Sequence, residues 1–236
     1  QMCIRDRYYA GQYSLDRYVR EGGMPGTLLY REKDDKYKYI RDVFETLIIR
    51  DITNKYSMRN KEVIHDLAYF MMDNISSLTS ANNISKSLAN ANIKITDKTI
   101  KLYMQYLKDS YLFYKVRRYD IKGKKYLATN DKYYLSDHSF RYAIIGTKNM
   151  DYGRVYENIV AIELLRRGYE VYVGKLYKKE VDFVAIKQNE KIYFQVSDDI
   201  SNQKTFDREV TSLLEIQDAY PKILLANTHH DEYQYE

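Results

Sequence analysis

Two alternating apolar segments, EVDFVAI at 180–186 and KIYFQVS at 191–197, constrain the fold of this chain more than any other feature. They flank a short polar stretch, a pattern typical of two antiparallel strands joined by a tight turn. A hairpin symmetric about that turn sets Asp182 opposite Gln195. A slip of one residue would mismatch both faces, so the register is well specified. In this register the apolar residues face one another as Val181 with Val196, Phe183 with Phe194 and Ala185 with Ile192.

The hairpin belongs to a longer alternation of helical and extended periods over residues 151–236. A helix is predicted from the run RVYENIVAIELLRRG, with Gly168 as its C-cap, and a strand from YEVYVG. After the hairpin, residues 205–217 predict another helix and KILLAN a final strand. The order helix, three strands, helix, strand predicts an α/β sandwich.

The preceding residues predict helices. A short helix within 14–30 is interrupted by glycines and a proline, and further helices are expected at 34–57 and 61–72. Ser80 would cap a helix at 80–89, and Thr96 or Asp97 one that ends near Asp109, after a short β-prone link at 94–96.

Two extended segments follow these helices, YLFYKVRRYD and YLATNDKYYLSD, joined by the turn IKGKK. Helix-turn-helix followed by a β-hairpin is the winged-helix arrangement. We therefore expect an α+β chain with a helical segment at 1–57, a winged helix at 58–150 and the α/β domain at 151–236.

Positive charge is concentrated in the predicted winged helix. Residues 91–150 hold 13 Lys or Arg and five Asp, a net charge of +8 against +5 for the whole chain. Lysine and arginine clusters bind phosphates and release counterions, which predicts DNA as a partner. A solvated basic face or a contact with another subunit would give the same pattern. The candidate residues are Lys98, Lys101, Arg117, Arg118, Lys122, Lys124 and Lys125.

Several function classes find no support. No run of about 18 to 20 apolar residues that could span a bilayer is present, so we expect no membrane partner and a cytoplasmic location. The single cysteine, Cys3, can form neither an internal disulfide nor a zinc knuckle. For the four histidines we expect surface or capping roles, with His138 in a loop. The 27 tyrosines suggest an AT-rich genome, and base-stacking rings are the alternative interpretation.

Asp182 and Gln195 are the candidates for chemistry. A carboxylate and a second oxygen donor on neighbouring strands are what Mg²⁺ requires, and Mg²⁺ can activate water and stabilise charge on a phosphate. A hydrogen-bonded polar pair near a sheet edge is the alternative.

The runs around Glu157, EVDFVAI and FQVS resemble the PD-(D/E)XK nuclease-like fold. The resemblance implies that Glu157 is the helix acid and Asp182 the motif aspartate, and together they would hold Mg²⁺. Gln195 takes the place of the second acid, and Ser197 that of the lysine. The resemblance thus implies a catalytic centre that lacks one carboxylate and its cation, unless Lys175, Lys179 or Lys204 approaches from elsewhere.

A wider resemblance covers residues 14–236. The ordered motifs GGMPG, RDVFETLIIRDI, SANNISKSLAN, YLFYKVRRYDIKGK and ENIVAIELLRRGYEVYVGK, then EVDF and FQVS, resemble prokaryotic AAA-type ATP-binding proteins with a C-terminal domain of unknown function. In that family an ATPase core precedes these motifs, and residues 1–57 would be the remnant of its lid. This chain has no GxxxxGK[ST] phosphate loop. We therefore expect a truncated piece of a larger protein, with ATP bound only by the parent.

Three functional hypotheses remain. The chain is a nucleic-acid-binding or regulatory region of an ATPase with a degenerate nuclease-like site, an active Mg²⁺-dependent DNA nuclease, or a module that packs against ATPase cores in an oligomer.

Overall fold

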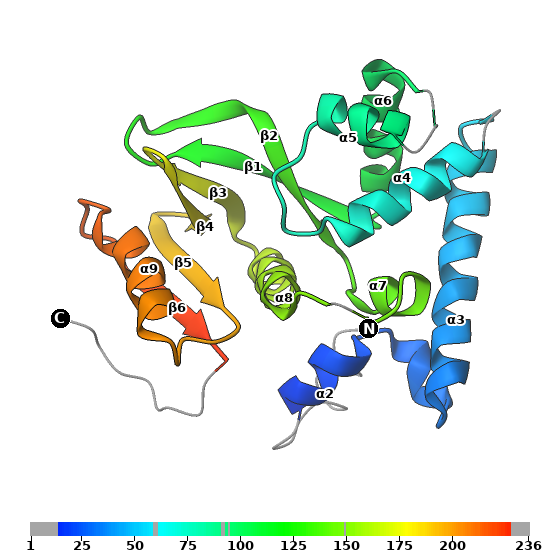
Figure 1. Ribbon diagram of the computed structural model, residues 1–236, viewed down its shortest axis with the longest axis horizontal. Coiled ribbons are helices and arrows are strands. Elements are labelled where there is room, and N and C mark those ends of the chain that lie inside the picture. Colours follow the sequence, from blue (N-terminus) through cyan, green and yellow to red (C-terminus); the bar gives the residue numbers. More distant parts are fainter. Residues whose placement is uncertain (1–13, 59–60, 91–92, 94, 149, 228–236) are drawn as a thin grey trace. The chain divides into compact units, whose positions relative to one another are not determined.

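The computed structural model describes residues 14–58, 61–90, 93, 95–148 and 150–227, so Cys3, His229 and His230 lie outside the described residues. The fold is α+β, as predicted. The chain divides into two compact units. Unit 1 comprises residues 1–115 and 130–150, and unit 2 comprises residues 116–129 and 151–236 (Figure 1).

Unit 1 is helical, and most of its helices match the predicted ranges. Ser80 and Thr96 act as the predicted caps, since their hydroxyls accept hydrogen bonds from the backbone N–H groups of Asn83 and Thr99. The helices are α2 (Ser14–Glu21), the 3₁₀ turn η1 (Pro25–Leu29), α3 (Lys33–Thr46), the π-helical η2 (Leu47–Asn54), α4 (Lys61–Asp73), α5 (Ala81–Asn90), α6 (Asp97–Asp109) and α7 (Ser139–Ile144).

The expected helix at 34–57 is continuous, but its hydrogen-bonding pattern changes at Leu47, where α3 gives way to η2. Ile40, Phe44, Ile48 and Ile52 are all fully or almost fully buried in one core. In an α-helix of 3.6 residues per turn, side chains four residues apart shift gradually around the helix axis. The wider turn of a π-helix reduces that shift, which keeps Ile48 and Ile52 directed into the core.

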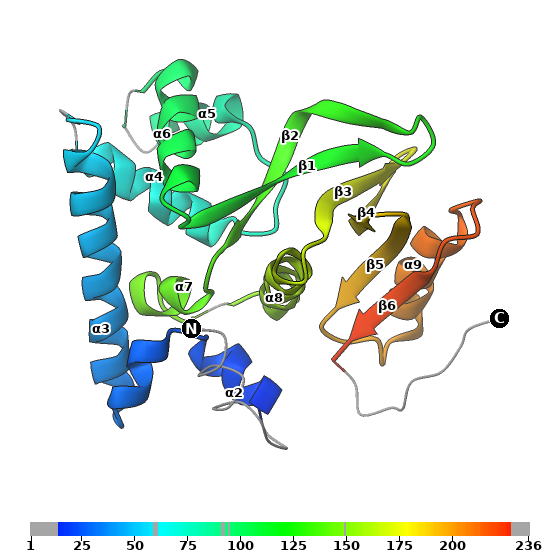
Figure 2. The same ribbon diagram turned by 180° about the vertical axis from the view of Figure 1, so that it is seen from behind.

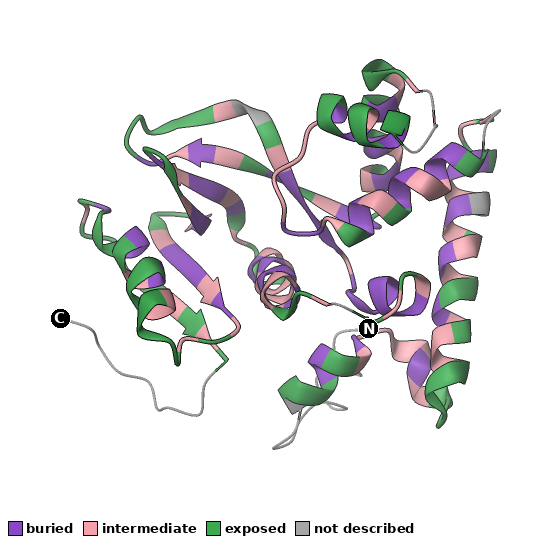
Figure 3. Ribbon diagram, in the orientation of Figure 1, coloured by how far each residue is buried: buried purple, intermediate pink, exposed green. Residues whose placement is uncertain are grey.

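Helix α7 was not predicted, and it is nearly all buried (Figure 3). His138 occupies its N-cap position, but the side chain makes no capping hydrogen bond and is only 1% exposed, so the expected surface or capping role of this side chain was wrong. Its Nε2 lies 2.9 Å from the carbonyl oxygen of Tyr18 and 3.1 Å from that of Val19. The hydroxyl of Tyr142 donates to the same Val19 carbonyl at 2.6 Å. These side-chain contacts with the carbonyls of Tyr18 and Val19 hold the end of α2 against α7 within unit 1.

Unit 2 is built on a mixed six-stranded sheet in the order β2-β1-β3-β4-β5-β6. β1 pairs in parallel with β3, β3–β4–β5 are antiparallel, and β5 pairs in parallel with β6. The strands are β1 (Phe113–Asp120), β2 (Lys125–Leu135), β3 (Glu170–Leu176), β4 (Lys179–Lys187), β5 (Glu190–Ser197) and β6 (Lys222–Ala226). Strand β1 starts and strand β2 ends in unit 1, and only residues 116–129 of this hairpin belong to unit 2.

Two helices pack on the sheet of unit 2, α8 (Tyr152–Arg166) and α9 (Gln203–Leu214), and the order helix, three strands, helix, strand matches the prediction (Figure 1). Gly168 follows α8 with a φ of +80°, the left-handed conformation of a C-cap glycine. Leu213 of α9 belongs to one hydrophobic cluster with Val184 and Tyr193 of the sheet. Among the described residues, no helix is both long enough and apolar enough to span a bilayer.

Candidate functional site

The predicted hairpin register is confirmed from Phe183 onward, where Phe183 pairs with Phe194 and Ala185 with Ile192. On its other edge, β4 contains a bulge. Tyr172 of β3 pairs with Val184, but Gly174 pairs with Val181, so β4 carries one residue more than β3 over this stretch. Such bulges redirect side chains and are frequent beside functional sites. This one lies at Asp182 and Phe183.

Asp182 is bound to the backbone and side chains of β5 rather than directed at solvent. Its carboxylate Oδ2 accepts a 2.8 Å hydrogen bond from the backbone N–H of Val196, and its own N–H donates to Gln195 Oε1 at 3.3 Å. Asp182 and Gln195 are only 8% and 7% exposed. The two residues predicted to lie opposite each other therefore meet, through hydrogen bonds.

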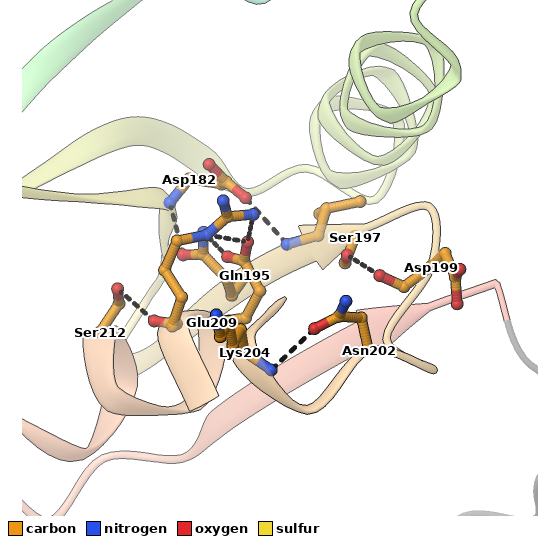
Figure 4. A network of polar contacts seen from close by, with 10 residues as sticks. Asp182, Gln195, Ser197, Asp199, Asn202, Lys204, Glu209 and Ser212 are labelled. Carbon is orange, nitrogen blue, oxygen red and sulfur yellow. Dashed lines mark hydrogen bonds and ion pairs between the residues drawn. The ribbon is translucent and has the colours of Figure 1, made fainter. Parts of the chain in front are cut away.

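A third side chain, Glu209 of α9, completes this group, which we call the buried polar network (Figure 4). The amide Nε2 of Gln195 donates to Glu209 Oε2 at 2.7 Å. The guanidinium of Arg208 donates to the other oxygen, Oε1, with its Nε at 3.0 Å. Glu209 is 6% exposed and its charge is balanced by that arginine. Both ends of the Gln195 amide are thus engaged.

Ser197, which the nuclease-like resemblance matches to a lysine, is also buried and donates its hydroxyl proton to the carbonyl of Asp199 at 3.0 Å. Of the lysines considered as substitutes, Lys179 and Lys204 line a cavity beside Asp182, and Lys175 does not. The ammonium of Lys179 is held by Glu215.

That cavity has a volume of about 650 Å³ and is lined by residues of both signs. Its lining includes the three network residues Asp182, Gln195 and Glu209. The remaining lining residues are Lys179, Glu180, Lys204, Asp207, Arg208, Thr211 and Ser212. A cavity of mixed charge next to a buried carboxylate is suited to a polar ligand.

Glu157, the predicted helix acid, is buried on α8 and does not line this cavity. Among the described residues, no group of three or more His, Cys, Asp or Glu side chains is arranged to hold a metal ion. The proposed pairing of Glu157 with Asp182 around Mg²⁺ stays a prediction.

Sequence reasoning missed Glu209, although a signal was present. Glu209, Leu213 and Ile216 follow the spacing of an apolar helical stripe, and all three are buried. An acid on such a stripe requires a buried partner, since an unpaired buried charge is costly. The partner could not be named before α9 was placed on β5.

The predicted basic residues are distributed over both units. Lys98 and Lys101 are exposed on α6 in unit 1. The other five lie in unit 2, on the β1–β2 hairpin. Four of these, Arg117, Lys122, Lys124 and Lys125, are exposed. Arg118 is half-buried, and its Nε is buried without a hydrogen-bond partner in the described structure.

These features define an α+β protein with a helical unit and a unit whose mixed sheet carries a buried carboxylate and amide network. Residues 12–151 match the family described as Domain of unknown function (DUF8612). The chain belongs to this family. The buried polar network lies outside the matched residues.

Two relatives extend the comparison over most of the chain. An uncharacterized protein of the bacterium Haemophilus influenzae is 36% identical over 215 residues, which cover 91% of this chain and 53% of the relative. An uncharacterized protein of the archaeon Methanocaldococcus jannaschii is 27% identical over 200 residues, 83% of this chain and 44% of the relative. The chain thus spans about half the length of the relatives it matches. No solved structure matches the chain.

Proposed function

We propose that this chain is a nucleic-acid-binding, regulatory region of an AAA-type ATP-binding protein, in which a nuclease-like centre binds without cutting. The observation that carries this proposal is the Gln195 amide, held between the backbone of Asp182 and the carboxylate of Glu209. A neutral side chain, hydrogen-bonded through both its oxygen and its nitrogen, stands where metal-dependent cleavage needs a carboxylate.

Metal-assisted cleavage of a phosphodiester requires oxygen ligands with free lone pairs and a group that activates water. In the buried polar network, one oxygen of Asp182 already accepts from Val196, and Glu209 accepts from both Gln195 and Arg208. Ser197 replaces the cation and donates to a nearby carbonyl. These contacts favour a structural role for the centre.

The charge distribution supports a nucleic-acid partner. The exposed Arg117, Lys122, Lys124 and Lys125 lie within nine residues of one hairpin. Phosphate contacts of this kind supply affinity that is independent of base sequence and falls steeply with salt. The winged-helix interpretation of α5, α6 and this hairpin, and the nuclease-like interpretation of residues 151–236, belong to the same proposal.

The ATPase assignment applies to a parent protein. The chain itself has no phosphate loop, so ATP binding is expected only in a longer protein. The relatives are about twice as long as the matched region, which leaves room in them for an ATPase core.

The proposal is tested by the affinity of the chain for duplex DNA over a range of salt concentrations. Reversing Arg117, Lys122, Lys124 and Lys125 to Glu should weaken binding and flatten its salt dependence. Arg118 is left in place, because a carboxylate at this half-buried position would destabilise the fold. Reversal of Lys33, Lys38, Lys55 and Lys61 in unit 1 is the control of equal charge. Unchanged affinity and salt slope in the hairpin variant would reject the DNA interface and favour packing against a protein.

A further inference from the structure

Two turns of unit 2 lie side by side at one end of the sheet, and the arrangement is visible from both sides (Figures 1 and 2). One joins β1 to β2 and the other joins β3 to β4. The backbone N–H of Ile121 donates to the carbonyl of Lys175 at 3.0 Å, and Lys122 Nζ lies 4.6 Å from the ring centroid of Tyr177. We call residues 121–126 and 175–178 the paired-turn surface.

The paired-turn surface is strongly basic. Its first turn holds three lysines and its second holds two, with no acidic residue in either. Within the described structure, none of these five lysines forms an ion pair, whereas the next lysine, Lys179, is paired with Glu215. The five are Lys122, Lys124, Lys125, Lys175 and Lys178. Among the described residues, the carboxylate at the first turn is that of Asp120, which accepts a 3.0 Å hydrogen bond from the N–H of Gly123, so the two turns keep an excess of positive charge that favours a polyanion.

Two tyrosine rings are interleaved with these lysines. Tyr126 and Tyr177 are each 60% exposed, among the most exposed large hydrophobic side chains of the described residues. The ring of Tyr126 also packs against two other tyrosine rings. Its centroid lies 5.7 Å from that of Tyr119 and 5.1 Å from that of Tyr172. A ring that is held in place by its neighbours but remains exposed to solvent is preorganised for stacking with a base.

Tyr177 occupies a backbone conformation that disfavours it. Its φ is +55°, in the left-handed region where glycine or asparagine is favoured and a bulky residue is strained. A glycine at this position would remove the ring and relieve the strain together, so the contribution of the ring can be separated from that of the fold.

We propose that the paired-turn surface binds single-stranded nucleic acid, with phosphates on the lysines and unstacked bases on Tyr126 and Tyr177. This inference rests on the proposed nucleic-acid function and specifies its substrate. Bases in a duplex are stacked internally, so exposed rings add affinity only for a single strand. Because every base has a π-face, the surface is indifferent to base sequence.

The test compares the affinity of the full chain for a labelled single-stranded DNA, the RNA of the same sequence and the annealed DNA duplex. We expect at least one single strand to bind more tightly than the duplex, and the two single-stranded arms distinguish DNA from RNA. Tyr126→Ala and Tyr177→Ala should each weaken single-strand binding by roughly fivefold or more, and leave duplex binding nearly unchanged.

Tyr177→Gly separates binding from folding, because it removes the ring and relieves the left-handed strain. It should lower single-strand affinity without lowering the melting temperature. Tyr111→Gly is the matched control, since Tyr111 is 69% exposed, has a φ of +59° and belongs to unit 1. It should leave affinity unchanged.

This inference would be overturned if the chain bound the duplex more tightly than both single strands, or if the tyrosine variants bound single strands as tightly as the original chain. In either case a salt-dependent affinity for duplex would leave the proposed function standing. Absence of binding to all three nucleic acids would overturn both.

Discussion

The side-chain amide of Gln195 donates a 2.7 Å hydrogen bond to the carboxylate of Glu209, and both residues are buried. An amide can donate, whereas a carboxylate at the same position could only accept. The neutral residue is therefore what allows three oxygen-rich side chains, Asp182, Gln195 and Glu209, to share one small volume. In the proposed nuclease-like interpretation, the neutral residue that takes the place of the second acid is therefore also one whose donor Glu209 can use.

The first prediction follows from that relationship. Gln195→Glu places a third carboxylate beside Asp182 and Glu209 and removes the donor, so it should destabilise the fold by about 1 to 3 kcal/mol at neutral pH. The like charges raise the folded-state pKa of the new carboxyl above its unfolded value of about 4.3. The cost is therefore absent below that value and develops as the pH rises toward the folded pKa.

Urea unfolding at acidic and neutral pH measures this effect. Gln188→Glu in the exposed β4–β5 turn serves as the control and should change stability by no more than about 0.5 kcal/mol. Equal stability of Gln195→Glu and the original chain at neutral pH would show that the amide donor is dispensable.

The second prediction concerns the glycine pair in GGMPG. The carboxylate of Asp137 accepts from the backbone N–H of Gly23 at 2.7 Å, and Gly22 has a φ of +80°. A Cβ on Gly22 would lie 2.4 Å from both Asp137 Oδ1 and Ser139 Cβ. Gly22→Ala should therefore cost about 3 kcal/mol or more, from backbone strain and overpacking together.

Gly146→Ala is the matched control, because Gly146 has a φ of +99° and a Cβ added to it would meet no described atom within 4 Å. It should cost only the backbone term of about 1 to 2 kcal/mol. Equal losses of stability in thermal unfolding would mean that the contact with Asp137 and Ser139 contributes nothing.

The third prediction is a pH dependence on α8. Hydrogen bonds from Arg166, and then from Arg167, lower the pKa of Glu163 to about 2. A lowered folded pKa contributes stability above the unfolded value, and that contribution is lost as the pH falls through the folded value. Glu163→Gln should thus lose up to about 1 kcal/mol at pH 7, a small effect because the pair is partly exposed.

Chemical unfolding of Glu163→Gln and the original chain across the acid range measures the difference. The deficit should shrink as the pH falls from about 4.5 toward about 2. A deficit that stays constant over this range would contradict the assigned ion pairs.

Local patterns predicted most elements of the fold. The pairing of Phe183 with Phe194 followed from alternation alone, because any other register would expose one apolar face. The caps at Ser80 and Thr96 followed from residue type and position.

Features that depend on distant packing could not be predicted in this way. Asp137 and Gly23 are 114 residues apart, and no periodicity links them. The bulge at Asp182 adds one residue to β4 and leaves no sign in the sequence pattern, so it could be recognised only once β3 was paired with β4. The helical stripe that contains Glu209 indicates a buried acid, but its partner Gln195 is identified only once α9 is placed against β5.

The most direct test of the central claim, that the buried polar network does not cut nucleic acid, is the topology of supercoiled plasmid incubated with the full chain and Mg²⁺ or Mn²⁺. We predict that the plasmid stays supercoiled and that Asp182→Ala changes nothing. The double variant Gln195→Glu with Ser197→Lys restores the acid and the cation of the nuclease-like motif. If this variant nicks the plasmid, descent from a nuclease is supported. Metal-dependent nicking by the unmodified chain that is lost in both Asp182→Ala and Glu157→Ala would contradict the account and establish an active nuclease.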